Sequence, residues 1–511
     1  MQSRGPVLSG LFTDNGLGLL AAYIERAGYK PVIFDYNNTE TIRDVAQHGK
    51  EGFVKGAVDE IDQFVKQKEL SIIGFKAYAN GFRDTVSMIS QLKHRNPKLK
   101  VVIGGPHVGW FGKHILNAST EADYAIIGEA EESLPMLIDS VYKGGTVQDI
   151  PNLIYRHGKD LVQNPRKFTK LDDLLHPIYN KEVYRDIESK IFVPVVENSR
   201  GCWWNKCSFC AYPLTNGLFR QRPVEQVVAE LEHNKNTFGA AFSRLADPSP
   251  SPKALHKLVD NLGPEYRLSS FIRTAKGYDF EKLARNFITF FVGVESANHH
   301  ALKNVLNKTN DPERYLADAR KMLSDAERAG ISMNVSMIIP SPGETDETMQ
   351  ESIDFILETQ PHYFTCLPLG PIPGRPVSEK ALEQGESGDL VLKDSHLSEG
   401  IFYEVDPLLP HDQWMDPLWY LRVNGELHPN AFEITKELIG QTMEAGIPPS
   451  SDEVVLMAYL MNNGLSDVKE ENRRQVFDFM MKARASLAEG NFEETEKLKD
   501  TINANQGIRW P

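Results

Sequence analysis

Three of the four cysteines of the chain lie in residues 199–210, which read Ser-Arg-Gly-Cys-Trp-Trp-Asn-Lys-Cys-Ser-Phe-Cys. Cys202, Cys207 and Cys210 are spaced C-x4-C-x2-C, so three thiolates could surround one metal centre. A structural zinc ion takes four protein ligands, whereas an iron–sulfur cluster held by three cysteines keeps one iron open to a substrate or cofactor. The next histidine is His233, so the spacing favours a cluster, with zinc or disulfide bonds as the alternatives.

Residues 6–130 alternate short apolar runs with amphipathic stretches, which predicts βαβ units around a doubly wound parallel sheet. A helix should start near Asp14 and end at Tyr29. The expected strands are Pro6–Phe12, Pro31–Asp35, Leu70–Lys76, Val101–Ile103 and Ala125–Ile127. An open α/β sheet binds its ligand at the carboxyl ends of its strands. The candidate binding turns are therefore residues 13–18, 77–81, 104–107 and 128–131.

A second series of strand and helix patterns begins just before the cysteines. The expected strands are Ile191–Glu197, Ala241–Ala246, Arg267–Arg273, Phe287–Glu295, Ser332–Ile339 and Tyr363–Leu367, with a helix at Pro223–Thr237. Six such units predict a partial TIM-type (β/α)6 barrel, in which chemistry takes place where the strands end. We therefore divide the chain into an N-terminal domain (1–140), a linker with a small hairpin (141–190), a barrel (191–380) and a helical C-terminal region (381–511).

Polar side chains follow or end several barrel strands. Asp247, Arg273, Glu295 and Ser296 are candidates for binding a small molecule, and Arg273 has a plain salt bridge as its alternative. Cys366, the remaining cysteine, is either a catalytic candidate or a small buried hydrophobe. The C-terminal helices, expected at Ala431–Ala445, Ser451–Met461 and Glu470–Glu489, should cap the barrel and help to form the substrate pocket.

The composition excludes several classes of function. The chain has 511 residues, 25% of them charged, with a formal net charge of −14, which argues against binding a nucleic-acid backbone. No run of about eighteen apolar residues could span a membrane. The opening residues lack the apolar segment of a secretory leader. We therefore expect a cytoplasmic protein in a reducing compartment.

The cysteine stretch resembles the cluster-binding loop of radical SAM enzymes, in which an aromatic residue precedes the last cysteine, as Phe209 does here. The spacing departs from the commonest family pattern, C-x3-C-x2-C, by one residue. The resemblance implies a [4Fe–4S] cluster and S-adenosyl-L-methionine (SAM). It places Asp247 near the SAM amino group, although Leu-Ala-Asp replaces Gly-Gly-Glu, and it places Glu295 on the ribose. Ser296 or Arg273 would bind the methionyl carboxylate.

The first 140 residues resemble the cobalamin-binding domain that precedes some radical SAM barrels. The turns Gly104-Gly105-Pro106-His107 and Gly128-Glu129-Ala130-Glu131 carry the likeness. The residues implied to bind cobalamin are Asp14, Asn15, Gly16, Gly104, Gly105, His107, Gly128 and Glu129. Gly16 stands where the wider cobalamin fold has its cobalt-ligating histidine, so cobalamin should bind base-off. A nucleotide pocket and an empty structural domain are the alternatives, and His107 could simply bond to backbone.

Together the two resemblances imply a cobalamin-dependent (class B) radical SAM methyltransferase. Such an enzyme uses a 5′-deoxyadenosyl radical and methylcobalamin to methylate an unactivated centre of a small molecule. An external electron donor such as flavodoxin or ferredoxin would reduce the cluster. A radical SAM cyclase or rearrangement enzyme is the second possibility, and a sensor of SAM or cobalamin without turnover is the third. No cysteines remain for an auxiliary cluster.

Overall fold

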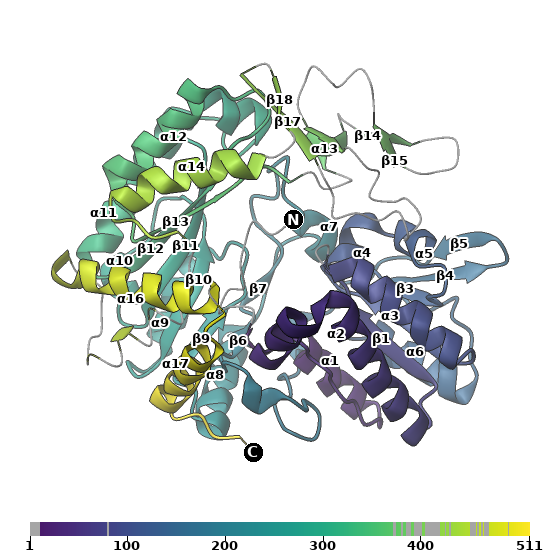
Figure 1. The fold of residues 1–511 in the computed structure, drawn as a ribbon. Helices are drawn as coiled ribbons and strands as arrows, with labels where there is room; N and C mark the ends of the chain where they lie inside the picture. Colours follow the sequence, from purple (N-terminus) through teal and green to yellow (C-terminus); the bar gives the residue numbers. More distant parts are fainter. Residues whose placement is uncertain are drawn as a thin grey trace.

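Two α/β units make up most of the chain, and Figure 1 shows them side by side, the first in purple and blue and the second in teal and green. The computed structural model describes residues 11–78, 81–370, 375–379, 431–449, 470–488 and 490–510, with short pieces at 382–384, 390–392, 401–403, 419–424, 426–428, 456, 459–460 and 463. The α/β class predicted from the alternating apolar runs is confirmed.

The first unit is built on a five-stranded sheet in the order β1-β2-β3-β4-β5. The strands β1 (Ile72–Lys76), β2 (Lys100–Gly104) and β3 (Tyr124–Ile126) are parallel. The hairpin of β4 (Leu153–His157) and β5 (Asp160–Gln163) adds to β3 in antiparallel fashion. The hairpin that we expected inside a linker therefore forms, but it belongs to the sheet of the N-terminal domain.

Helices cover both faces of this sheet, because successive side chains of a strand point to opposite faces. Val101 and Ile103 pack in a cluster with residues of three helices, whereas Val102 packs on the other face with Leu137. The helices of the first face are α3 (Phe82–Arg95), α4 (Pro106–Phe111) and α5 (His114–Ala118), and α6 (Ser133–Lys143) covers the second. The helices α1 (Asn15–Arg26) and α2 (Thr39–Gln67) precede them in the chain.

Two strands that we expected at the start of the chain do not join this sheet. Residues 6–10 of the first lie outside the described residues, and Phe12 makes one parallel bridge to Ile191. In the second expected strand, Pro31–Asp35, Ile33 makes a parallel bridge to Tyr184, which belongs to the segment that leads to the barrel. The parallel part of the sheet therefore begins at β1.

The second unit is a six-stranded parallel sheet in the order β13-β12-β11-β10-β9-β6, as expected for a partial barrel. Its strands are β6 (Val195–Val196), β9 (Phe242–Leu245), β10 (Arg267–Ile272), β11 (Phe287–Glu295), β12 (Ser332–Ile338) and β13 (Tyr363–Leu367). Its helices are α8 (Val224–Phe238), α9 (Pro252–Asp260), α10 (Phe280–Leu283), α11 (Pro312–Arg328) and α12 (Asp346–Thr359). The main hydrophobic core lies between these strands and helices.

The cysteines lie between β6 and α8, in a loop that returns on itself. The short strands β7 (Ser199–Arg200) and β8 (Arg220–Gln221) pair in antiparallel fashion at its base, and α7 (Tyr212–Asn216) lies within it. Figure 1 shows α7 beside α4 of the first unit. The loop is therefore placed where the two units meet.

Short elements complete the described chain. They are η3 (Leu171–Asp173), η4 (Ile187–Ser189), η5 (Ala301–Val305), α13 (Pro376–Glu379), the pair β14 (Leu382–Gln384) and β15 (Leu390–Leu392), and the antiparallel strands β16 (Ile401–Tyr403), β17 (Trp419–Val423) and β18 (Glu426–His428). Strands thus occur in a region that we expected to be helical. Most of the helix expected at Ser451–Met461 lies outside the described residues.

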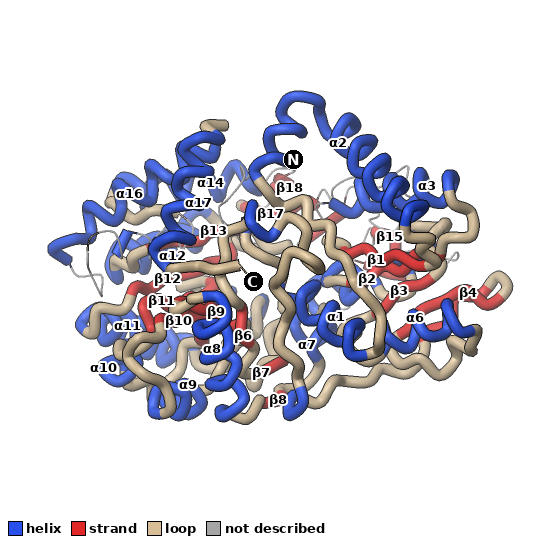
Figure 2. Tube along the Cα trace, turned by 90° about the horizontal axis from the view of Figure 1, so that it is seen from below, coloured by secondary structure: helices blue, strands red, loops and turns tan. Residues whose placement is uncertain are grey.

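The described helices at the end of the chain do not lie over the mouth of the barrel, where we had expected a cap. α14 (Ala431–Glu444) packs along β13 and α12, while α16 (Glu470–Ala488) and α17 (Phe492–Gln506) lie lower in Figure 1, as Figure 2 also shows from below. Their buried side chains join those at the beginnings of strands, among them Phe242, Ile288 and Tyr363. The C-terminal helices therefore close the end of the barrel opposite to the carboxyl ends of its strands.

Candidate active site

The cysteine loop is held in place by backbone hydrogen bonds to distant parts of the barrel. The amide of Ser208 donates to the carbonyl oxygen of Leu306 over 3.0 Å, and Arg375 donates to the carbonyl oxygen of Cys207 over 2.7 Å. Gly201 has a φ of +79°, and a Cβ there would lie 2.6 Å from the carbonyl oxygen of Leu218. Only glycine therefore lets the two arms of the loop approach each other at its entrance.

The three thiols of the loop are partly or fully buried and unpaired as disulfides. Burial raises the pKa of Cys210 to about 11, with Cys207 and Cys202 near enough to contribute. Across the described residues, no three His, Cys, Asp or Glu side chains converge on a single metal ion. Zinc would require such convergence, whereas cysteines of a [4Fe–4S] cluster bind different iron atoms. Three cysteines suit a cluster that keeps one iron open, whereas a structural zinc ion takes four protein ligands.

Arg273, at the end of β10, lies beside the cysteine loop. Its guanidinium is 4.0 Å from the Cys207 sulfur and 4.4 Å from the ring centre of Trp204, and it donates a hydrogen bond to the carbonyl oxygen of Lys308. A planar guanidinium can stack on an aromatic ring and donate at its edge at the same time. The structure thus brings Arg273 to the cluster loop.

Glu295 ends β11 in an unusual conformation. Its φ is +77°, and the pairing of β11 with β12 is irregular between Gly293 and Glu295. Bulges at barrel rims re-aim side chains, and a non-glycine residue in this region of φ is strained. The carboxylate turns back over Gly293, where a Cβ would lie 2.1 Å from Glu295 Oε1, and it binds Lys308 Nζ at 2.8 Å. Lys308 is a site residue that the sequence analysis missed.

Asp247 follows β9 and is fully buried. Its Oδ1 accepts hydrogen bonds from the Ser199 amide and, over 2.8 Å, from the Ser199 hydroxyl, at the start of the cysteine loop. Oδ2 has no hydrogen bond in the described part of the chain, although the Asn198 amide is close enough to lower the pKa of the carboxyl. Burial dominates and raises that pKa to about 7. An incompletely satisfied acid here fits the ammonium group of SAM.

Ser296 and Cys366 do not take the places that we expected. The Ser296 hydroxyl is completely buried, lies 3.3 Å from that of Ser352 on α12, and accepts a hydrogen bond from the Asn298 amide. Cys366 packs in the core between strands and helices, and its thiol donates to the Ile339 carbonyl oxygen over 3.5 Å. Both side chains face away from the barrel interior, and their roles in SAM binding and catalysis stay predictions.

The interior of the barrel is lined by residues that the sequence analysis did not single out. They alternate along the strands with the core residues of the opposite face: Arg244, Phe271, Phe291, Asn334 and Thr365. Arg244 lies 4.9 Å from the ring centre of Phe271, which packs on Phe291 at 4.8 Å. Thr365 donates to Asn334 over 3.2 Å. The interior is thus cationic and aromatic near β9 and β10, and polar near β12 and β13.

The turns of the N-terminal domain show a mixture of open and occupied positions. A Cβ added at Gly104 would meet no atom within 4 Å, so a ligand can come close to this backbone. Gly105 has a φ of +98°, and a Cβ there would lie 2.8 Å from the Ala77 carbonyl oxygen. Asp14 caps α1 and pairs with Lys76, and the Asn15 amide oxygen accepts a hydrogen bond from Tyr179 over 2.6 Å.

His107 belongs to the core of the domain and not to its ligand face. Its ring lies 4.7 Å from that of Phe82 and 4.6 Å from that of Phe111, and 1% of its surface is exposed. Burial lowers its pKa to about 3, so the ring is neutral at physiological pH. This packing favours the alternative of a structural histidine, and contact with cobalamin stays a prediction.

Glu129 has a different role from the one expected, because it joins the two units. Its carboxylate binds Arg220 on β8 and lies 3.3 Å from Arg200 on β7, the two strands at the base of the cysteine loop. It also accepts a hydrogen bond from the Thr169 amide. Glu131 binds Arg200 at 2.6 Å, and Glu197 binds the same guanidinium at 2.7 Å. The turn at 128–131 is thus tied by charge-assisted bonds to the base of the cysteine loop.

Close backbone packing strengthens this junction. A Cβ at Gly109 on α4 would lie 2.4 Å from the Thr215 side chain on α7, and one at Gly128 would lie 2.5 Å from Arg166. Arg166 donates to the carbonyl oxygens of Leu214 and Thr215 over 2.5 and 2.9 Å. Two glycines of the N-terminal domain therefore make room for the helix that follows the cysteines.

Family comparisons agree with this arrangement. Residues 6–138 match the B12 binding domain, and residues 196–356 match the radical SAM superfamily. The second match contains all three clustered cysteines. The chain combines a B12-binding domain with a radical SAM domain. These domains imply a [4Fe–4S] cluster, SAM and cobalamin as its cofactors.

Relatives of this radical SAM enzyme have several activities. An uncharacterised methyltransferase of Pyrococcus horikoshii is 28% identical over 345 residues, which are 63% of this chain and 72% of that protein. The anaerobic magnesium-protoporphyrin IX monomethyl ester cyclase of Cereibacter sphaeroides is 22% identical over 409 residues, 76% of this chain and 63% of the cyclase.

Two solved structures share the fold. The radical SAM methyltransferase TsrM from Kitasatospora setae, with cobalamin and a [4Fe–4S] cluster bound, superposes with a TM-score of 0.66 and 16% identity. The match covers 93% of this chain and 97% of TsrM. The cobalamin-dependent radical SAM enzyme OxsB gives a TM-score of 0.53 at 16% identity, over 68% of this chain and 49% of OxsB. The chain thus shares its fold with TsrM and OxsB.

None of the described helices is both long enough and apolar enough to cross a bilayer.

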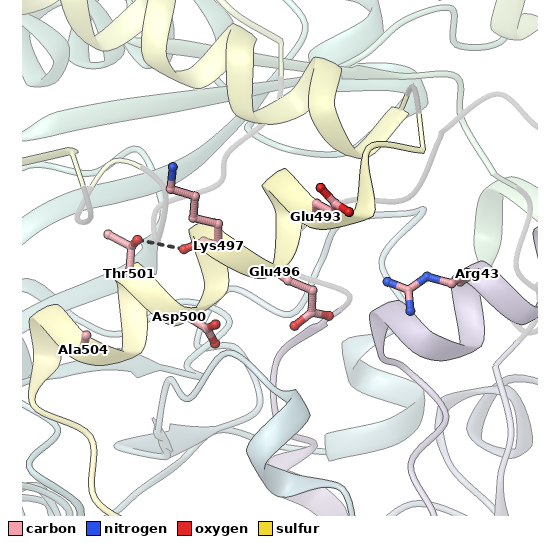
Figure 3. A pocket seen from close by; sticks show the side chains of 7 residues that line it. All are labelled: Arg43, Glu493, Glu496, Lys497, Asp500, Thr501 and Ala504. Carbon is pink, nitrogen blue, oxygen red and sulfur yellow. Dashed lines mark hydrogen bonds between the residues drawn. The ribbon is translucent and has the colours of Figure 1, made fainter.

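A hollow of about 610 Å³ lies between α2 and α17, where Arg43 faces Glu493, Glu496 and Asp500 (Figure 3). It contains none of the residues discussed above, so we do not assign it to the reaction.

The buried carboxyl of Asp247 predicts a pH dependence of SAM binding. An ammonium group binds the carboxylate form, and the carboxyl is half protonated near pH 7, so binding should release a proton below that pH. The affinity should therefore rise with pH and be about tenfold weaker at pH 6 than at pH 8. Anaerobic calorimetry on the reconstituted enzyme measures this. Asp247→Asn should abolish the dependence, and an unchanged pH profile in that variant would contradict the assignment.

Proposed function

We propose that the enzyme is a cobalamin-dependent methyltransferase that methylates an unactivated centre of a small molecule. The observation that carries the proposal is the contact between the cysteine loop and the binding turns of the B12 domain. Arg200 and Arg220, at the base of the loop, bind Glu129 and Glu131 of the turn after β3. A chain that uses a cluster and cobalamin in one reaction needs their two binding regions to adjoin.

The residues of the chain have separate tasks in this proposal. When bound, the cluster supplies an electron for SAM cleavage and cobalamin supplies a methyl group for transfer. Cys202, Cys207 and Cys210 hold the cluster, Asp247 binds the SAM ammonium, and Arg273 binds its carboxylate. The turns around Gly104 and Gly105 accept the corrin ring. The protein's contribution is to bind, orient and exclude water.

The substrate would lie in the barrel interior, beyond the cysteine loop. Arg244 and the adjacent rings of Phe271 and Phe291, which are tilted by 60° to each other, suit a molecule with an acidic group and a flat apolar part. Tryptophan, named as the substrate of TsrM in one solved complex, is a molecule of this kind. An external one-electron donor such as flavodoxin or ferredoxin would serve the enzyme in the reducing cytoplasm.

The test is anaerobic turnover with SAM that carries a deuterated methyl group. The reconstituted enzyme is supplied with cobalamin, a reductant and candidate acceptors, tryptophan among them. A methyltransferase consumes two SAM molecules for each methylated product, one giving deoxyadenosine and one giving S-adenosylhomocysteine, and the label appears in the product by mass spectrometry. The cobalt(II) spectrum should show base-off cobalamin, since Gly16 supplies no ligand.

Other results would favour the other functions. The match to a cyclase makes ring closure the second candidate, and it predicts deoxyadenosine and an altered product without S-adenosylhomocysteine. A sensor would form neither product from SAM. Either outcome would overturn the methyltransferase proposal.

A further inference from the structure

A cation lies at the ligand-binding edge of the N-terminal sheet. Lys76 is the last residue of β1, and its neighbour on β2 is Gly104, whose Cα faces open space. Parallel strands place their carboxyl ends at one edge, and this edge binds the ligand in open α/β sheets. The Lys76 side chain keeps 24% of its surface exposed, so it is not sealed inside the protein at this edge.

Asp14 fixes the position of this ammonium group. One carboxylate oxygen, Oδ2, pairs with Lys76 Nζ, while Oδ1 accepts the amide of Leu17 over 2.9 Å and so caps α1. The Asp14 amide donates a hydrogen bond to the Tyr184 hydroxyl oxygen over 2.8 Å. Burial by itself would lower the pKa of Lys76, but Asp14 and Tyr78 raise it above its ordinary value. The side chain therefore stays charged.

Lys76 also fills the space next to Gly16. A Cβ added at residue 16 would lie 3.3 Å from Lys76 Nζ and 3.3 Å from Asp14 Oδ1. A side chain at residue 16 would therefore crowd the ion pair of Asp14 and Lys76. Lys76 thus occupies the space that a ligand from residue 16 would have to enter.

We propose that Lys76, held by Asp14, places a fixed positive charge against the sheet-facing side of the bound corrin and leaves cobalt without a protein ligand on that side. The inference rests on the proposed cobalamin-dependent function and adds a residue to it. An ammonium group has no free electron pair, so it acts on cobalt only through its charge. A nearby positive charge stabilises the form with the lower charge, cobalt(I), relative to cobalt(II).

The first experiment tests the position of Lys76 by electron paramagnetic resonance of cobalt(II) cobalamin in the full-length holoenzyme. Gly16→His alone should show no nitrogen splitting from the protein, because the ion pair blocks the imidazole. Gly16→His combined with Lys76→Ala should show it, and Gly16→Ala with Lys76→Ala is the matched control without an imidazole. Nitrogen splitting in Gly16→His alone would overturn the proposed position.

The second experiment tests the charge. In a redox titration followed by the absorption of cobalamin, Lys76→Met should lower the cobalt(II)/cobalt(I) midpoint potential, whereas Lys76→Arg should keep it near that of wild type. At the wild-type midpoint, the ratio of cobalt(I) to cobalt(II) in Lys76→Met should fall about tenfold, as a charge a few ångströms away in a partly buried site predicts. Equal potentials in all three proteins would overturn the inference.

The two levels of the argument can fail separately. A wild-type chain that bound no cobalamin, as measured by its cobalt content, would overturn the proposed function and this inference with it. A wild-type chain that bound cobalamin, but whose potential did not respond to Lys76→Met, would overturn the inference alone. Cobalt content and thermal melting of each apoprotein show whether a variant folds and binds, and Lys76→Arg, which preserves the ion pair, gives the charge test a second folded reference.

Discussion

Cys207→Ala should eliminate the cluster and reduce deoxyadenosine formation below detection. Cys207 is the most buried of the three clustered cysteines, with 8% of its surface exposed, and its sulfur lies beside the Arg273 guanidinium. Two remaining thiolates cannot hold a [4Fe–4S] cluster stably with one iron open to SAM. Iron and sulfide analysis after anaerobic reconstitution should give about four of each per wild-type chain and far less in the variant.

Cys366→Ala is the matched control for this prediction. It removes the one cysteine outside the cluster loop, whose thiol lies in the core and bonds to a backbone carbonyl. Its iron content should equal that of wild type, with a loss of stability of about 1–2 kcal/mol from the small cavity. Wild-type iron content in Cys207→Ala, or about eight iron atoms in the unmutated chain, would refute a single cluster held by these cysteines.

The strands of the barrel could be predicted from the sequence because each one is a local pattern of apolar residues. Phe287–Glu295 and Tyr363–Leu367 were predicted with the bounds that the structure gives. The three cysteines predicted to hold the cluster are also a local signal, since they lie within nine residues of one loop. The strand expected at Pro31–Asp35 shows the limit, because Ile33 finds its partner about 150 residues away, in Tyr184.

Side-chain roles were harder to predict, because they depend on partners from elsewhere in the chain. Ser296 and His107 follow their strands as binding residues do, yet their side chains are enclosed by Ser352 and by two phenylalanines. Glu129 was expected at a cofactor and instead binds two arginines that lie about 70 and 90 residues further on. Lys76 and Lys308 carry no motif, and only the fold shows what they bind.

Breaking the ion pair between Glu295 and Lys308 should strongly destabilise the barrel. Both side chains are about nine-tenths buried, and their charged groups are 2.8 Å apart. Lys308→Met would leave the Glu295 carboxylate buried without a cation, and Glu295→Gln would leave the Lys308 ammonium group buried without an anion. Each change should lower the free energy of unfolding by about 3–5 kcal/mol. The double variant should regain most of this loss, because neither charge remains. Anaerobic urea denaturation followed by circular dichroism measures the three changes.

The same variants decide whether Glu295 also binds SAM. A carboxylate that bonds the ribose contributes charge-assisted hydrogen bonds of roughly 1.5–3 kcal/mol, so its loss would weaken SAM binding about ten- to a hundredfold. The double variant removes the carboxylate but should keep the fold. A change in its affinity for SAM therefore reflects the lost carboxylate and not a loss of stability. If Glu295 binds the ribose, we expect weak SAM binding, normal iron content and a normal cobalamin spectrum in that variant. Wild-type affinity for SAM in the double variant would make the strained Glu295 a structural acid. Its ion pair with Lys308 would then serve to position the Lys308 carbonyl oxygen, which accepts a hydrogen bond from Arg273 beside the cluster.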